Sequence, residues 1–203
     1  MSMVERLRAR VAVLPPGRRI VAVAGPPGAG KSTLAAALVA GRSDAALVEM
    51  DGFHLDNPVL EARGLMARKG APETFDADGF VAAVARLRAG GEVVLPAFDR
   101  GRDLAVAGAR VVPEAARILV VEGNYLLLDR APWDALLPMF DLTVSVDPGE
   151  EVIRDRLIAR WRGHGLDEAA ALARAEGNDL PNAALIRAES VPAQVTLGVA
   201  DGA

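Results

Sequence analysis

The sequence predicts an α/β fold in which helices cover both faces of a parallel sheet. Two observations carry this prediction. Short apolar runs alternate along the chain with amphipathic stretches of helical period, which is the pattern of consecutive strand–helix–strand units. Most of these runs are apolar at nearly every position, as expected for parallel strands that are buried on both faces.

The predicted elements alternate along the chain. Strands are expected at residues 19–24, 45–50, 117–121 and 142–146, with a further short strand at 92–95. Helices are expected at residues 31–40, 79–89, 133–139, 148–162 and 167–175. Residues 55–78 form a long stretch without a periodic pattern, and ordered loops of that length are usually functional.

Composition limits the class of protein. A chain of 203 residues that is 51% hydrophobic predicts one compact domain, residues 1–203. A net charge of −4 argues against binding to nucleic acid or to an anionic membrane, since both need a basic face. The chain has no cysteine, no apolar run of about 18 residues and no apolar signal segment near its start, so a cytoplasmic location is expected.

The stretch GPPGAGKST, residues 25–33, follows the first predicted strand and leads into a helix. It satisfies the pattern G-x-x-x-x-G-K-[ST]. The glycines let backbone N–H groups surround a phosphate, and the helix N-terminus adds its positive dipole. One of the chain's two lysines stands here among many arginines, because a compact ammonium can bridge two phosphates where a planar guanidinium fits differently. The residues expected to bind the nucleotide are Gly25, Gly28, Ala29, Gly30, Lys31, Ser32 and Thr33.

Two carboxylates are expected at the carboxyl edge of the sheet, where open α/β sheets bind ligands. Asp51 directly follows the second predicted strand. It can accept a proton from an attacking hydroxyl or help to position Mg²⁺, although Asp-Gly is also a common turn dipeptide. Glu122 ends the third predicted strand, and we expect it to hold Mg²⁺ together with Ser32; the alternative is a solvated acid at a strand end.

Two arginines of the predicted helix 148–162 are candidate catalytic residues. Arg156 and Arg160 lie four residues apart on one face, and neither has a carboxylate at helical pairing distance. We expect them to close on the transferred phosphate as part of a helical lid, residues 154–180, with Arg162 as a further candidate. A carboxylate elsewhere in the fold, or simple solvation, is the alternative.

Several further side chains are candidates for holding a second substrate. They are cations and one aromatic ring in or near the predicted loops, and a solvated loop is the alternative interpretation. His54 has no second histidine near it in the sequence, so it is predicted to be a hydrogen-bonding pocket residue rather than a metal ligand. With His54 and Asp51, the candidates are Arg63, Lys69, Phe75, Arg100 and Arg102.

Together these stretches resemble the P-loop kinases grouped as uridine kinase, phosphoribulokinase and bacterial-type pantothenate kinase. The resemblance covers residues 20–182. A finer likeness, to a bacterial branch labelled fructose transport system kinase or nucleoside kinase, lies in DGFHLDN (51–57), RGLMARKGAPETFD (63–76) and GNDLPNA (177–183). The stretches that carry the broader resemblance are GPPGAGKS (25–32), MDGFH (50–54), PETFDADGF (72–80), PAFDRGRD (96–103) and VVEGNY (120–125).

The resemblance implies a three-layer α/β/α P-loop nucleoside triphosphate hydrolase fold with a helical lid. It implies a kinase that uses ATP and Mg²⁺ to phosphorylate a hydroxyl of a sugar, a nucleoside or a similar metabolite. In it Lys31 and Ser32 would hold the phosphates and Mg²⁺, and Asp51 would be the catalytic base.

The chain departs from the uridine kinase pattern at Gly52, His54 and Phe98, where the acceptor is expected to lie. These departures argue against uridine as the acceptor.

An accessory ATPase or switch protein that serves a protein partner is the alternative function. The chain lacks the guanine-reading motif N-K-x-D, and its D-x-x-G stretch, residues 76–79, precedes a helix instead of following a strand. A GTPase is therefore disfavoured. The expected partner is a small-molecule substrate, and a second copy of the chain is a further candidate partner.

Overall fold

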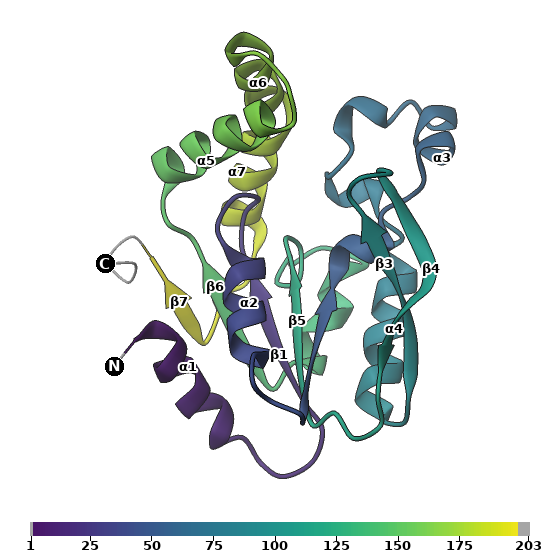
Figure 1. The fold of residues 1–203 in the computed structure, drawn as a ribbon, viewed down its shortest axis with the longest axis vertical. Coiled ribbons are helices and arrows are strands. Elements are labelled where there is room, and N and C mark those ends of the chain that lie inside the picture. Colours follow the sequence, from purple (N-terminus) through teal and green to yellow (C-terminus); the bar gives the residue numbers. More distant parts are fainter. Residues whose placement is uncertain (1, 199–203) are drawn as a thin grey trace.

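The computed structural model describes residues 2–198 and contains a five-stranded sheet in the order β2-β5-β1-β6-β7. Every neighbouring pair in this sheet is parallel. Figure 1 shows β1 in the middle of the sheet, between β5 and β6. The strands are β1 (Arg19–Ala24), β2 (Ala45–Glu49), β5 (Ile118–Gly123), β6 (Leu142–Val146) and β7 (Val195–Leu197).

The sheet separates two apolar clusters because side chains of a strand alternate between its faces. In β1, Ile20, Ala22 and Ala24 enter one cluster, whereas Val21 and Val23 enter the other. All five of these residues are almost fully buried. The prediction of a parallel sheet covered on both faces is thereby confirmed.

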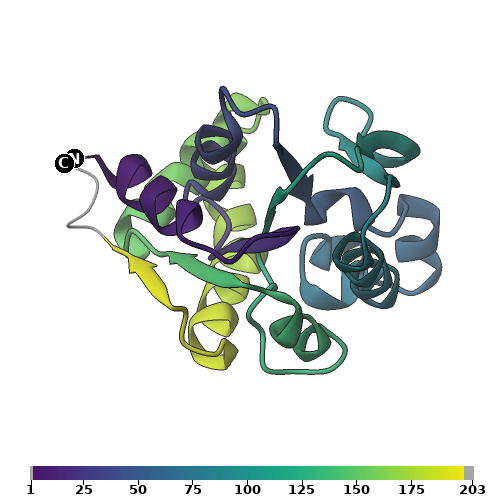
Figure 2. The same cartoon turned by 90° about the horizontal axis from the view of Figure 1, so that it is seen from below.

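Helices from different parts of the chain cover the two faces (Figures 1 and 2). One cluster includes side chains of α1 (Met3–Ala12) and α2 (Lys31–Val39). The opposite cluster includes side chains of α4 (Ala77–Ala89), of the 3₁₀ segment Trp133–Met139 and of α7 (Leu180–Glu189). The fold is therefore the predicted three-layer α/β/α arrangement.

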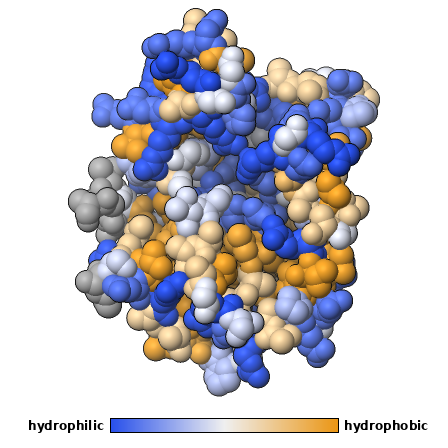
Figure 3. Space-filling model, viewed as in Figure 1, coloured by the Kyte–Doolittle hydropathy of each residue, from blue (hydrophilic) through white to orange (hydrophobic). Residues whose placement is uncertain are grey.

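Two structures stand above the carboxyl edge of the sheet on either side of a hollow (Figure 3). On one side lie α5 (Glu150–Gly163), α6 (Glu168–Arg174) and the π-helical segment Ala175–Asp179, which together correspond to the predicted lid segment. On the other side lie α3 (Asn57–Ala62) and an antiparallel hairpin, β3 (Val93–Asp99) with β4 (Leu104–Val112). Hydrophilic residues gather on this upper part of the molecule in Figure 3.

The structure differs from the predicted elements at several places along the chain. The stretch 55–78 is not irregular, since it contains α3 and the 3₁₀ turns Met66–Arg68 and Pro72–Thr74. These are too short to show a helical period. Residues 133–139 form a 3₁₀ helix that contains Pro138, which cannot donate a backbone hydrogen bond. Four further elements lie outside the predicted ones: α1, α7, β4 and β7.

None of the helices within residues 2–198 is both long and apolar enough to cross a membrane.

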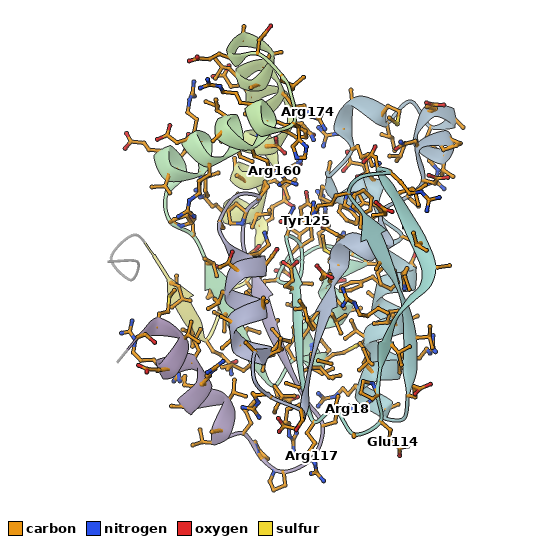
Figure 4. All side chains as sticks on the ribbon, viewed as in Figure 1. Arg18, Glu114, Arg117, Tyr125, Arg160 and Arg174 are labelled. Atoms are coloured by element: carbon orange, nitrogen blue, oxygen red, sulfur yellow. The ribbon has the colours of Figure 1, made fainter. Side chains whose placement is uncertain are left out.

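Arg18 lies at the end of the sheet opposite the hollow (Figure 4). Its side chain connects the sheet to the layer that contains α4. Its guanidinium donates to five backbone carbonyl oxygens at distances from 2.9 to 3.2 Å. Two acceptors lie at the end of α4 and three lie in the turn that leads into β5. A guanidinium has five N–H donors, so this one side chain can bind all five carbonyl oxygens. The acceptors belong to Leu87, Gly91, Pro113, Glu114 and Ala116.

We expect Arg18→Ala to lower the free energy of unfolding by about 2 kcal/mol, because hydrogen bonds from a charged donor are lost. Urea denaturation would measure this change. Arg18→Lys should restore only part of it, since an ammonium offers three donors. Arg117→Ala is the matched control, because Arg117 is exposed and its side chain donates no hydrogen bond within the described residues. Equal losses in Arg18→Ala and Arg117→Ala would contradict this role of Arg18.

Candidate active site

The loop between β1 and α2 has the geometry of a phosphate cradle. Gly25, Gly28 and Gly30 all have positive φ, of 145°, 79° and 100°, which favours glycine. A Cβ added at Gly25 would overlap the carbonyl oxygen of Val146 at the end of β6. The sequence pattern therefore follows from close packing of this loop on the sheet, as well as from the shape that a phosphate needs.

Lys31 extends from the start of α2 into the site, where only 7% of the residue is exposed. Its Nζ donates to the carbonyl oxygen of Pro26 at 2.9 Å and to Oδ1 of Asn124 at 2.7 Å. Burial lowers the pKa of Lys31, and the nearby carboxylates of Glu122 and Asp51 oppose this shift. The ammonium is therefore held in place by two oxygens before a phosphate binds.

Glu122 lies beside Ser32, as predicted for a magnesium pair. The hydroxyl of Ser32 donates to Oε1 of Glu122 at 3.1 Å, and Glu122 is 4% exposed. Burial raises the pKa of Glu122, while Lys31 opposes the shift. No cluster of three His, Cys, Asp or Glu side chains suited to a metal occurs within residues 2–198. Two protein oxygens fit Mg²⁺, which keeps several of its waters and is usually held by few protein ligands plus phosphates.

A cavity of about 510 Å³ extends from the phosphate-binding loop to Lys69, the hairpin and the lid segment. It brings together most of the side chains that the sequence predicts. The predicted residues that line it are Gly28, Gly30, Lys31, Ser32, Thr33, Asp51, His54, Lys69, Phe75, Arg100, Glu122 and Arg160.

Asp51 stands in the 3₁₀ turn Met50–Phe53 that directly follows β2. Its Oδ2 accepts a hydrogen bond from Arg100 of the hairpin at 2.7 Å. Its Oδ1 has no hydrogen-bond donor within the part of the chain that the structure describes. One carboxylate oxygen of Asp51 is thus fixed by Arg100, and the residue lines the cavity.

His54 forms an aromatic wall of the cavity with two phenylalanines. Its ring lies between Phe75, at 4.1 Å between centroids, and Phe98, at 4.7 Å. Its Nδ1 lies 2.9 Å from the carbonyl oxygen of Asp51. Burial lowers the pKa of His54, although Asp51 opposes the shift, so the imidazole is neutral near pH 7. A pocket role fits these contacts better than a metal-binding one, as the sequence predicts.

The two predicted lid arginines differ in position. Arg160 lines the cavity and forms no ion pair with any described carboxylate (Figure 4). Arg156 donates from Nη1 to the carbonyl oxygens of Gly28, at 3.3 Å, and Ala29, at 3.2 Å. Arg156 therefore packs the lid segment against the phosphate-binding loop and does not line the cavity.

Some predicted residues lie outside the cavity. Gly25 and Ala29 belong to the loop but do not line the cavity, and Ala29 is buried in an apolar cluster. Arg63 ends α3 and lines a second cavity of about 470 Å³, which shares Phe75 as a wall. Arg102 is exposed in the hairpin turn, where its backbone N–H donates to Asp99. The prediction that Arg63 and Arg102 contact the same substrate as Asp51 is therefore not supported, because both side chains belong to other surfaces.

Several cavity residues were not predicted from the sequence. Asn124 holds Lys31, and the stretch VVEGNY contains it, so a signal was present without an assigned role. Trp161 lines the cavity, and its Nε1 donates to Oδ2 of Asp179 at 2.6 Å. The others come from separate elements that only the fold brings together, and they include Asp103 of the hairpin turn, His164 after α5 and Arg174 of α6.

The parallel sheet and this loop define a P-loop protein that binds a nucleoside triphosphate. The chain belongs to the Phosphoribulokinase / Uridine kinase family, whose model matches residues 20–176. It is a kinase that transfers a phosphate to an alcohol group.

Three known proteins illustrate the similarity. A solved structure from Silicibacter sp. TM1040, named a "putative fructose transport system kinase", is 45% identical with a TM-score of 0.88, covering 97% of this chain and 99% of that one. "Putative uridine kinase C227.14" of Schizosaccharomyces pombe is 33% identical over 198 residues, which is 89% of this chain and 83% of that protein. Pantothenate kinase of Streptomyces coelicolor is 36% identical over 156 residues, which is 70% of this chain and 47% of that protein.

We expect the imidazole of His54 to titrate below its ordinary pKa of 6.5. Because burial disfavours the charged ring, the unfolded chain binds this proton more readily, and the free energy of unfolding should fall as the pH drops below 6.5. NMR titration of the histidine ring signals would measure this pKa. His54→Gln assigns the signal and should weaken the pH dependence of stability. A His54 signal that titrates above 6.5 would contradict the neutral pocket role.

Proposed function

We propose that this kinase moves the γ-phosphate of ATP to a hydroxyl of a small polar metabolite, with Asp51 as the catalytic base. The observation that carries the proposal is the shared cavity. The phosphate-binding residues Lys31 and Ser32 line one part of it, and Asp51 lines another part beside an aromatic wall. A triphosphate and an acceptor can therefore meet within one cavity.

The proposed reaction assigns a role to each polar group. The acceptor hydroxyl oxygen forms a bond to the γ-phosphorus, and the bond from that phosphorus to the bridging oxygen breaks to release ADP. Oδ1 of Asp51 takes the hydroxyl proton. Lys31 and the loop N–H groups hold the phosphates, and Arg160 faces the charge that spreads over the phosphoryl oxygens.

Ser32 and Glu122 would hold Mg²⁺, which supplies charge neutralisation at the phosphates when bound. Their oxygens lie 3.1 Å apart, so one cation could be held by both residues.

The acceptor half of the cavity favours a sugar, a nucleoside or a similar metabolite. Its wall combines rings of His54, Phe75 and Phe98 with the charged groups Asp51 and Arg100. The names of the similar proteins give three different acceptors, so we propose the class of acceptor and not one compound. An accessory ATPase is the second candidate function. It would not explain why an aromatic and charged pocket lies beside the phosphate-binding residues.

We also retain three predictions from the sequence: a single domain over residues 1–203 with a lid at 154–180, a cytoplasmic location, and a small molecule as partner, with no nucleic acid. A homodimer remains a candidate assembly.

The experiment that tests the proposed function is a panel of acceptors. Sugars, nucleosides and pantothenate would be incubated with the enzyme and Mg·ATP, with products identified by mass spectrometry. We expect at least one acceptor to gain one phosphate and to stimulate ADP release. ATP hydrolysis that ignores every acceptor, with no phosphorylated product, would favour the accessory ATPase instead.

We expect Asp51→Asn to lower turnover by ~10²-fold or more with ATP affinity nearly unchanged, because an amide cannot accept the proton but can still bind Arg100. Steady-state kinetics and calorimetric ATP binding would separate the two effects. Asp129→Asn is the matched control, since Asp129 is exposed and does not line the cavity. Turnover like that of the parent enzyme in Asp51→Asn would remove Asp51 from the reaction.

We expect Arg160→Ala to lower turnover by ~10³-fold while the melting temperature stays the same, because a cation that acts in the transition state is lost. Arg156→Ala should instead weaken ATP binding, since Arg156 holds the loop at Gly28 and Ala29. Arg154→Ala is the control, because that exposed arginine pairs with Glu176 within the lid segment. Equal effects of all three substitutions would contradict a special role for Arg160.

A further inference from the structure

Lys69 lines the acceptor part of the cavity, yet its ammonium is fully occupied by protein oxygens. Nζ donates to Oδ1 of Asn57 at 2.6 Å and to the carbonyl oxygen of Asp103 at 2.9 Å, and it pairs with Oδ2 of Asp103 at 2.9 Å. An ammonium has three N–H donors, and all three are used. The side chain is 10% exposed. To bind an acceptor directly, Lys69 would have to give up one of these contacts.

The backbone of Lys69 is held from the opposite side of the cavity, by the lid segment. Its carbonyl oxygen accepts from Nδ2 of Asn178 at 2.9 Å and from Nη2 of Arg174 at 3.3 Å. Arg174 also donates to the carbonyl oxygen of Ala67 at 3.0 Å, and its guanidinium stacks over Trp161 (Figure 4). Asn178 is 2% exposed and lies in the π-helical segment, a distortion that is frequent at functional sites.

Further contacts connect Lys69 to Asp51, the proposed catalytic base. Asp103 lies in the turn of the β3–β4 hairpin, and it is the one non-glycine residue with positive φ in the described chain. The same hairpin carries Phe98 of the aromatic wall and Arg100, which binds Asp51. An unbroken path therefore runs from the lid segment through Lys69 and Asp103 to Asp51.

We propose that Lys69 is a positioning residue that joins the lid segment to the hairpin and acts on the acceptor through that hairpin. Its backbone binds the lid and its ammonium binds Asp103, so the lid can take its place over the phosphates only when the hairpin is also in place. The kinetic consequences of this proposal rest on the proposed function, whereas the physical connection between lid and hairpin does not.

The connection can be measured as a distance, because the chain has no cysteine of its own. Ala170→Cys in α6 and Ala107→Cys in β4 are exposed positions for two spin labels. In this pair we expect one narrow distance distribution by double electron–electron resonance, with or without Mg·AMP-PNP. Lys69→Met should broaden it, because methionine keeps the backbone carbonyl but loses the ammonium.

Asn178→Asp should also broaden the distribution, since a carboxylate of the same size cannot donate to the carbonyl oxygen of Lys69. Arg154→Ala is the matched control, because it breaks an ion pair within the lid segment and leaves the Lys69 contacts intact. If Lys69→Met fails to fold, Asp103→Asn is used instead, because it removes the carboxylate that pairs with Lys69. Asparagine tolerates the positive φ at this position, and the backbone carbonyl oxygen of residue 103 is kept. An unchanged distribution in the folded variants, or equal broadening in Arg154→Ala, would overturn the proposal.

Kinetics with an acceptor from the panel distinguish positioning from direct binding. If Lys69 positions the hairpin, Lys69→Met and Asn178→Asp should each lower kcat/KM for the acceptor by roughly tenfold. The double variant should then be no worse than the poorer single variant, because both substitutions break one path. Effects that multiply, or a loss confined to Lys69→Met, would identify Lys69 as a direct ligand. If the panel yields no acceptor, the proposed function fails while the distance measurement still decides this proposal.

Discussion

The ammonium of Lys31 is buried at the carboxyl edge of the sheet, and most of the site is arranged to satisfy it. A buried cation needs oxygens around it, and Pro26, Asn124 and the nearby carboxylate of Glu122 supply them. Each of these groups comes from the end of β1 or β5, which are neighbours in the sheet. The order of the strands therefore determines which side chains can surround the phosphates, and α2 supplies the ammonium from its first residue.

The carboxyl edge of the sheet also positions the proposed acceptor half of the cavity. The turn after β2 brings Asp51 to the cavity, but Asp51 is held by Arg100 from a hairpin that is not part of the main sheet. That hairpin is held in turn by Lys69. The phosphate half rests on rigid, buried strands, whereas the acceptor half depends on polar contacts between partly exposed segments. Such segments open at lower free energy than a core, which suits a site that must admit and release two substrates.

The lid segment touches both halves through different arginines. Arg156 holds the phosphate-binding loop, Arg174 holds the segment that contains Lys69, and Arg160 faces the space between them. Arg156 and Arg160 lie one turn apart on α5, and two cations at that spacing repel each other if left unpaired. Backbone carbonyl oxygens accept hydrogen bonds from Arg156 and Arg174, whereas Arg160 forms no ion pair with any described carboxylate.

The sequence by itself determined the sheet, the phosphate-binding loop and the carboxylates at strand ends, because hydrophobic period and glycine spacing are local properties. It also predicted a pocket role for His54, whereas it left Phe75 between a pocket and a solvated loop. It did not show that Arg160 and Arg100 line the cavity whereas Arg156, Arg63 and Arg102 do not. The position of a cation depends on which carbonyl or carboxylate oxygen the fold brings opposite it. Only the tertiary structure decided that Lys69 is saturated by Asn57 and Asp103, since those oxygens lie 12 and 34 residues away along the chain.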